Sequence, residues 1–549
     1  MRDGKKTDSG HPLNLVAGPF RTLPEQPSDS RRLEPNHERP ASIPTRLLDL
    51  TAFGGGNNGV CDIKLWNITG SCPEYLTLSH CWGKGEFGIP ENIKTKTDTL
   101  QKQKARIAVA RLPQTFRDAI EITLRLGFRY LWIDALCIIQ DSLEDWATES
   151  RKMGYIYSHS VLNIAASGSS DSHGGCFNSA SCPQDRITGL RSNKIMQLPS
   201  TLKNGTKSVL LLWLNQYDRR ERLFAGNYQP GNNSNVPGLL HHSAVLNRGW
   251  IFQERMLSKR VVHFTKHQVL WECRESWEAE DSLYVDTDWG VTKCLHVSRD
   301  DFLNYWYIRI VAGEYSCQRF TFSKDRLIAI AGLAELFQQE FGLEYLAGIW
   351  ALPGYGDAES KNQEYLRQAL SWYSPDPDKV DVPSHRELTW SWVSHNGKVD
   401  WHSNRPNSSQ LEPVPPEWLL IVKQCYLFHE GKPTHALGPI DYGYLVVEGF
   451  LTQGKMSWIY DVVTGAKGSS RPGQRAEAAY HPDDDRSFPT GDVFFLILDE
   501  TEKDLVHTMM ILELIQSANN SYKRMAIVFI ALTDLKWLES GKRTTFKLF

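Results

Sequence analysis

The sequence predicts an α/β protein with a parallel sheet at its core, followed by a helical region and a β-rich end. Two short apolar runs, at residues 130–134 and 161–166, are typical of strands buried on both faces of a parallel sheet. Segments of helical periodicity precede each run, so strands and helices alternate from residue 75 to residue 166. This alternation favours right-handed βαβ connections and therefore a parallel layer.

Each element of the layer has its own local evidence. Apolar and polar residues alternate over Tyr75–Ser79, which indicates a strand that runs into the loop His80–Gly83. A helix is expected after Leu112–Phe116, with apolar residues near one face and Gly127 at its end. The second strand is expected at Tyr130–Asp134. A second helix over 142–157 and a third strand over 161–166 complete the pattern.

The rest of the chain divides into further expected elements. Residues 168–240 contain clusters of Gly, Ser and Asn and are expected to be irregular. Beyond them we expect a helix at 248–254, a hairpin from 260–264 and 268–273, and a helical region over 300–340. Strands are expected at 444–448, 493–498 and 525–530, and residues 463–491 are expected to form a mobile loop.

These elements predict four regions. Residues 1–45 are polar and rich in Pro, Arg and Ser, and we expect a disordered leader there. The α/β domain is expected over 46–290, with its motifs between 75 and 273. A helical companion region at 291–416 and a β-rich region at 417–549 follow.

Composition excludes several classes of protein. A net charge of −3 provides no basic field for binding nucleic acid. No run of about 18 apolar residues predicts a membrane span, and no apolar signal segment opens the sequence. The 10 cysteines are scattered without CxxC pairs, which is typical of reduced thiols. We therefore expect a cytoplasmic protein without a metal site.

Three blocks of sequence carry a resemblance to a known family. They are Tyr75–Gly83 (YLTLSHCWG), Leu112–Tyr157, which includes YLWIDALCIIQD, and Arg248–Glu254 (RGWIFQE). Their order, spacing and composition resemble the fungal heterokaryon incompatibility (HET) domain. The sequence departs from that family at His80, where Tyr is usual, and at Ala135, where Ser is frequent.

The resemblance implies a biological role. HET domain proteins act in fungal non-self recognition, which leads to programmed cell death. It also implies a protein partner in incompatibility signalling and a homo-oligomer. Segments at 315–316, 325–327, 345–350 and 389–392 resemble the companion region of the same family.

A more remote resemblance, to TIR domains, implies a chemistry. TIR domains have a flavodoxin-like parallel sheet, and several members cleave NAD with a glutamate that lies four residues after a tryptophan. Trp250 and Glu254 have that spacing, which places them on one helix face. The resemblance implies an NAD-nucleosidase-type hydrolase with NAD as substrate and no cofactor, Glu254 as the catalytic carboxylate and Trp250 as a stacking ring. The other residues expected to line the crevice are Ser79, His80, Asp134 and Arg248.

Two alternatives to this chemistry stay open. In the first, Arg248 and Glu254 form an ion pair that fixes the helix to the sheet, and Trp250 belongs to the core. The domain would then be a non-enzymatic assembly module that triggers death by oligomerisation with a partner. In the second, Asp134 binds no ligand and orients a cation such as Arg248.

The remaining motifs predict structure rather than chemistry. Residues 83–88 read G-x-G-x-x-G, but no helix signal follows, so we expect a loop over a ligand edge and no Rossmann site. Cys81 and Cys137 are expected to be buried packing residues. Asp141 and Asp145 are expected to cap a helix. Glu149 is expected to pair across the fold and not with Arg151 or Lys152.

Overall fold

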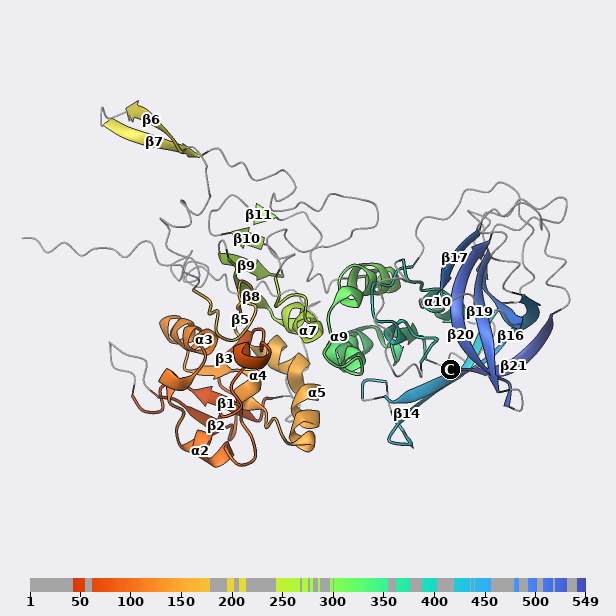
Figure 1. The fold of residues 1–549 in the computed structure, drawn as a ribbon, viewed down its shortest axis with the longest axis horizontal. Coiled ribbons are helices and arrows are strands. Elements are labelled where there is room, and N and C mark those ends of the chain that lie inside the picture. Colours follow the sequence, from red (N-terminus) through yellow and green to blue (C-terminus); the bar gives the residue numbers. More distant parts are fainter. Residues whose placement is uncertain are drawn as a thin grey trace, which may run out of the picture. The chain divides into compact units, whose positions relative to one another are not determined.

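The computed structural model divides the chain into two compact units, Met1–Leu295 and His296–Phe549 (Figure 1). The structure describes residues 43–54, 62–177, 195–201, 207–213, 243–266, 269–274, 277–279, 285–286, 297–299, 301–353, 362–375, 388–401, 419–434, 436–438, 440–455, 478–482, 492–500, 507–516, 519–530 and 541–549. Most of the expected leader, 1–45, lies outside these residues.

The first unit contains a nine-stranded mixed sheet in the order β11-β10-β9-β8-β5-β3-β4-β1-β2. Its four central strands are parallel to one another: β8 (Arg260–Phe264), β5 (Asn163–Ala165), β3 (Tyr75–Ser79) and β4 (Tyr130–Trp132). The outer strands pair in antiparallel fashion: β1 (Arg46–Asp49), β2 (Lys64–Asn67), β9 (Val269–Cys273), β10 (Trp277–Ala279) and β11 (Val285–Asp286). The expected parallel core and the expected hairpin are confirmed, and antiparallel strands extend both edges.

Helices connect the parallel strands. The helices of this unit are α2 (Leu100–Ala105), α3 (Gln114–Arg125), α4 (Asp134–Cys137), α5 (Leu143–His159) and α7 (Gly249–Leu257). Short 3₁₀ turns occur at Gly85–Phe87 and Val109–Arg111. Because β3 has β4 on one side and β5 on the other, right-handed connections place α3 and α5 on opposite faces of the sheet. Figure 1 shows the central strands between these two helices.

Local sequence explains where these helices begin. Pro113 immediately precedes α3. Proline has no backbone N–H group, and a helix start tolerates this because the first N–H groups have no acceptor within the helix. The hydroxyl of Ser142 accepts a hydrogen bond from the amide of Asp145, so Ser142 caps α5. The expected cap by Asp145 is wrong, because its carboxylate is engaged elsewhere. The second strand also ends two residues earlier than expected, since Asp134 already begins α4.

The core of the first unit lies on both faces of the parallel strands. Every residue of β3 is buried, as a parallel strand between two helical layers requires. Trp132 is fully buried and packs edge-to-face against Tyr157 of α5, with ring centroids 5.7 Å apart. A separate cluster of buried apolar residues gathers near β9 and β10, comprising Cys81, Val245, Leu246, Ile251, Leu270 and Trp277.

The expectation that residues 168–240 are irregular is wrong for two segments. Strands β6 (Ile195–Thr201) and β7 (Lys207–Trp213) form an antiparallel pair. The β-branched and apolar residues of KSVLLLW outweigh the surrounding Gly and Asn clusters. Residues 178–194, 202–206 and 214–240 of that segment lie outside the described residues.

The second unit begins with helices and an aromatic core. Its helical elements are α8 (Phe302–Asn304), a π-helix at Tyr305–Ala312, 3₁₀ turns at Tyr315–Cys317 and Trp392–Ser394, α9 (Asp325–Phe341) and α10 (Asn362–Leu370). Strands β12 (Glu344–Leu346) and β13 (Ile349–Ala351) form a hairpin. The core of this part is aromatic. Ring centroids lie 4.9–6.2 Å apart among Phe302, Trp306, Phe337 and Trp350, and the burial of these rings holds the helices and the hairpin together.

The end of the second unit is a barrel-like sheet. Its strands are β14 (Ile421–His429), β15 (Lys432–Pro433), β16 (Tyr442–Lys455), β17 (Ala478–Pro482), β18 (Asp492–Glu500), β19 (His507–Gln516), β20 (Ser521–Ile530) and β21 (Lys542–Leu548). The path β16-β18-β19-β20 closes on itself because β21 pairs with both β16 and β20. The three expected strands lie within β16, β18 and β20. Within the expected loop 463–491, residues 478–482 form β17, and the others lie outside the described residues.

Among the residues that the structure describes, no helix has the length and apolar character needed to cross a membrane.

Candidate functional site

A polar cluster lies at the carboxyl end of β3, beside the first residue of β5. The two strands are neighbours in the sheet. Thr77 pairs with Asn163 and Ser79 pairs with Ala165, so Ser79 lies near Asn163. The amide nitrogen of Asn163 donates to the Ser79 hydroxyl oxygen at 3.0 Å, and the Ser79 hydroxyl donates to the Glu254 carboxylate. Sequence reasoning missed Asn163, although a polar residue inside the apolar run VLNIAA was a signal for it.

Glu254 is the buried centre of this cluster. It lies on α7 and is 4% exposed. Burial raises its pKa to about 7, hydrogen bonds from Ser79 and Tyr157 oppose that rise, and the charge of Asp134 adds to it. The carboxyl group can therefore hold or release a proton near neutral pH. Tyr157 of α5 is a second site residue; it ends the second motif block, although no role in the site was expected of it.

Arg248 makes a different contact from the ion pair considered above. It immediately precedes α7, and its Nη1 atom donates to the backbone carbonyl of His80 at 2.5 Å. In the described part of the chain no ion pair joins Arg248 to Glu254. Arg248 instead ties the start of α7 to the residue that follows β3.

His80 is buried beside Asp134. Its Nδ1 atom lies 4.0 Å from an Asp134 carboxylate oxygen, and its ring meets Phe116 edge-on at a centroid distance of 5.0 Å. Burial lowers the pKa of His80 to about 4, because Asp134 only partly offsets the cost of charging the ring. The ring is therefore neutral at physiological pH. Its Nε2 atom is buried without a hydrogen-bond partner among the described residues.

Asp134 is the most accessible carboxylate of the cluster. Its side chain is 21% exposed, and one oxygen accepts a hydrogen bond from the indole nitrogen of Trp82 at 2.8 Å. The other oxygen accepts from the backbone amide of Ala135 at 2.7 Å, at the first turn of α4. The strand-end position thus holds the carboxylate at the sheet edge where ligands of α/β proteins bind.

Trp250 and Glu254 lie one turn apart on α7. The indole of Trp250 is half-buried against the main core and meets Trp146 of α5 edge-to-face, with centroids 6.3 Å apart. Of the residues proposed from sequence, the structure joins Ser79 with Glu254, His80 with Arg248, and His80 with Asp134. Trp250 belongs to the same helix and has aromatic contacts of its own.

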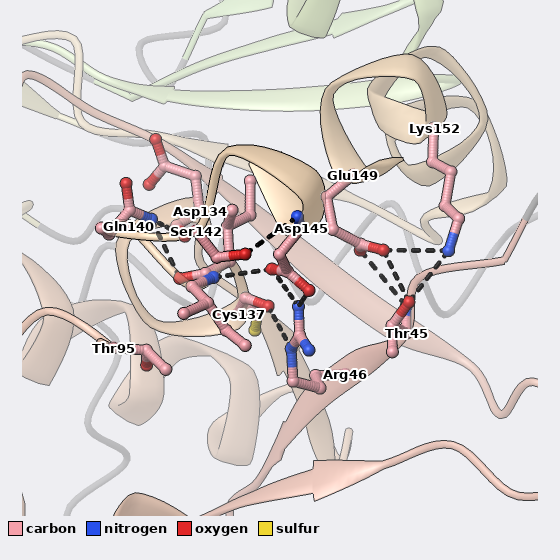
Figure 2. A network of polar contacts seen from close by, with 12 residues as sticks. Thr45, Arg46, Thr95, Asp134, Cys137, Gln140, Ser142, Asp145, Glu149 and Lys152 are labelled. Carbon is pink, nitrogen blue, oxygen red and sulfur yellow. Dashed lines mark hydrogen bonds and ion pairs between the residues drawn. The ribbon is translucent and has the colours of Figure 1, made fainter. Parts of the chain in front are cut away.

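A second network holds the turn that carries Asp134, and Figure 2 shows it. Arg46 of β1 donates through Nε to the carbonyl of Cys137 at 2.7 Å and through Nη2 to Asp145 at 2.7 Å. Asp145 also accepts from the amide of Ile139 at 2.8 Å. The buried Arg46 thereby clamps α4 and the start of α5 to the sheet. No sequence motif marked Arg46, because its partners are 91 and 99 residues away.

Glu149 belongs to this network too. Its carboxylate accepts from the Thr45 hydroxyl at 2.6 Å, which confirms the expected pairing across the fold. Lys152 donates to the same carboxylate at 2.9 Å (Figure 2), so the expectation that Glu149 avoids Lys152 is wrong. The two residues are three positions apart on α5, and that spacing brings them together on a helix face.

A protein-family model matches the part of the chain that contains this site. Residues 75–254 match the family model described as "Heterokaryon incompatibility protein (HET)". This protein carries a HET domain. The matched span begins at the first residue of β3 and ends at Glu254, so it includes every site residue named from sequence. No curated protein and no solved structure matches the chain.

Two further candidate motifs in the HET domain, the cysteines and the glycine motif, have structural roles. Burial raises the pKa of Cys81 to about 11 and that of Cys137 to about 12, so both thiols are protonated packing residues, as expected. Within the described ranges no group of His, Cys, Asp and Glu could hold a metal ion. The glycine motif forms a turn: Gly83 has φ +76°, and a Cβ there would lie 2.0 Å from the carbonyl oxygen of Phe87.

Proposed function

We propose that the HET domain hydrolyses NAD or a related nucleotide, with Glu254 as the central carboxylate. The domain itself supports involvement in heterokaryon incompatibility. In this proposal nucleotide loss is the event that starts programmed cell death after fungal non-self recognition. The observation that carries the proposal is a buried carboxylate with a pKa of about 7, hydrogen-bonded to Ser79 at the carboxyl edge of parallel strands.

The place of the cluster in the sheet supports this function. The parallel strands have the order β4-β3-β5-β8, and the chain leaves β3 toward β4 and then returns to β5 on its other side. Ligands of doubly wound sheets bind at such a change of direction, beyond the carboxyl ends of the strands. In our proposal this strand order is that of TIR domains and flavodoxin-like proteins. Ser79 is the last residue of β3, and Asp134 comes two residues after the end of the neighbouring β4.

The chemistry of the cluster also fits N-glycosidic cleavage. As nicotinamide leaves, positive charge develops on the ribose, and a nearby carboxylate stabilises that charge. Water then adds to the ribose, which gives free nicotinamide, ADP-ribose and a proton. Glu254 supplies the carboxylate, neutral His80 and Asp134 supply acceptors for ribose hydroxyls, and Arg248 supplies a cation for the phosphates. Trp250 provides an aromatic face one turn from Glu254.

A second function is favoured by a different observation. Ser79, His80 and Glu254 are all nearly inaccessible to solvent. Buried polar residues that satisfy one another also specify a unique core. The HET domain would then act as an assembly module, in which oligomerisation with a protein partner triggers death without turnover.

The release of nicotinamide separates the two functions. The purified full chain is incubated with NAD, as isolated and after fusion to an inducible dimerising domain, and free nicotinamide is quantified. Under the hydrolase proposal, wild type releases nicotinamide in at least one state and Glu254→Gln does not. Glu149→Gln is the matched control, because Glu149 is an equally buried glutamate that contacts Thr45 and Lys152 outside the cluster, and it should retain turnover. A folded wild-type protein that releases nothing in either state would support the assembly module.

A further inference from the structure

We infer that Ser167, His263 and Glu272 form a second site in the first unit, a serine nucleophile with its base and orienting carboxylate, suited to apolar acyl esters. None of these residues takes part in the Glu254 cluster. The inference is therefore independent of the proposed nucleotide hydrolysis.

The three side chains form a continuous chain of hydroxyl, imidazole and carboxylate. The Ser167 hydroxyl oxygen lies 3.0 Å from Nδ1 of His263, and Nε2 of His263 lies 2.9 Å from a Glu272 carboxylate oxygen. Both distances are within hydrogen-bond range, so one imidazole joins hydroxyl and carboxylate. Serine triads on unrelated folds have the same sequence of hydroxyl, imidazole and carboxylate, with the hydroxyl on Nε2 and the acid on Nδ1; here the two ring nitrogens have exchanged roles.

Arg255 determines the direction of these hydrogen bonds. Its Nε atom lies 3.1 Å from both carboxylate oxygens of Glu272, and this ion pair favours the charged form of the buried carboxylate. A charged carboxylate only accepts, so Nε2 of His263 carries the proton and donates to Glu272. Nδ1 is then unprotonated and accepts the Ser167 hydroxyl, which is the protonation state of a general base.

Ser167 is the most exposed of the three residues, because it lies in the turn that follows β5. It comes two residues after β5, and its amide bonds to the carbonyl of Ala165 at 2.8 Å in a tight turn. Ser167 is 4% exposed, whereas His263 on β8 and Glu272 on β9 have no exposed surface. The hydroxyl of Ser243 donates to the Ser167 carbonyl at 2.8 Å and fixes this turn.

The surroundings indicate an apolar acyl group. Trp277 stacks on the His263 ring with centroids 5.6 Å apart and planes 18° apart, which covers one face of the base. Trp277 also belongs to the buried apolar cluster with Val245, Leu246 and Leu270. An apolar environment favours a small uncharged acyl chain over a charged one.

The reaction step follows from the protonation states. The Ser167 oxygen attacks the acyl carbon while its proton passes to Nδ1 of His263, and the bond to the alcohol breaks as that proton moves to the leaving oxygen. Water then repeats the step and releases the carboxylic acid. The amides of Gly168 and Ser169 already bond to the carbonyls of Phe264 and Ala166. Without those donors an oxyanion gains less stabilisation, so we expect turnover about 10²–10³-fold below that of a complete site.

Slow turnover makes covalent capture the suitable experiment. The native full chain is treated with a biotinylated alkyl fluorophosphonate, whose phosphorus bonds to the serine oxygen as fluoride leaves. Intact mass should show one adduct, and peptide mapping should place it on Ser167. Heat-unfolded protein should remain unlabelled, because the hydroxyl then lacks its base.

Variants test each member of the group. Ser167→Ala should abolish the adduct, and His263→Asn should slow labelling at least about 10²-fold. Ser169→Ala is the matched control, since Ser169 lies in the same loop, is equally buried and bonds to Asp171, and it should be labelled like wild type. Absence of an adduct on Ser167 in native wild-type protein would overturn the inference and leave the three residues as a structural network. Equal labelling of wild type and the His263 variant would overturn it as well.

Discussion

Replacement of Glu254 by Gln should make the protein more stable, and the gain should grow with pH. Burial raises the pKa of Glu254 to about 7 in the folded chain, against an ordinary value of 4.5. The folded state therefore binds this proton more tightly than the unfolded state does. Wild-type protein has the full contribution of the protonated group below pH 4.5 and loses it as pH rises to about 7.

The size of the effect follows from the same values. The difference between about 7 and 4.5, at about 1.4 kcal/mol for each pH unit, is worth about 3 kcal/mol. Gln keeps the shape of the side chain and a hydrogen-bonding oxygen for Ser79, but it does not ionise. The variant should therefore gain free energy of unfolding relative to wild type as pH rises. Between pH 4.5 and a pH above neutral, this gain should be about 3 kcal/mol.

Thermal unfolding of the full chain, followed between about pH 4.5 and pH 8, measures this difference. We expect the Tm difference between Glu254→Gln and wild type to increase by roughly 6–12 °C across that range, because 1 kcal/mol corresponds to about 2–4 °C in a domain of this size. Parallel pH curves for the two proteins would refute the reasoning, since they would show that Glu254 has the same proton affinity in the folded and unfolded states. If the stability of the variant relative to wild type fell as pH rises, a cation would have to stabilise the charged form of Glu254 in the folded protein.

Three further predictions concern the framework of the HET domain. Asp145→Asn should lower the free energy of unfolding by about 3–5 kcal/mol in urea titrations, because it leaves the Arg46 guanidinium buried without its carboxylate; an unchanged midpoint would contradict the clamp. Gly83→Ala should cost about 1–3 kcal/mol, measured by thermal unfolding, since φ is +76° and the new Cβ meets the Phe87 carbonyl; wild-type stability would show that the turn can relax. Cys137, with a pKa of about 12, should resist iodoacetamide at neutral pH in native protein and react after unfolding, as mass spectrometry would detect.

The inaccessibility of Glu254 also bears on function. Under the proposed hydrolysis, a substrate reaches the carboxylate only if neighbouring residues move, whereas Asp134 already has exposed surface at the same sheet edge. Because the proposed hydrolysis requires such a movement, the nicotinamide assay includes an induced dimer. The pH experiment tests the protonation of Glu254 independently of any substrate.

Local sequence determined the central strands and helices of the first unit and identified the HET domain. The apolar runs that became β4 and β5, the alternation at Tyr75–Ser79 and the periodicity of α3 and α5 each act over a few residues, so pattern alone located them. The motif blocks also identified the HET domain correctly. The spacing of Trp250 and Glu254 fixed their places one turn apart on α7, because helical geometry relates such positions directly.

Only the tertiary structure decided which side chains meet. The partner of Ser79 is 175 residues away on Glu254, and the partners of Arg46 are 91 and 99 residues away, so neither contact has a sequence signature. The protonation of Glu254 is likewise a tertiary property, since it depends on how completely the fold excludes water from one carboxylate. Elements arise from interactions between near neighbours in the chain, whereas sites arise where the sheet order brings distant strands side by side.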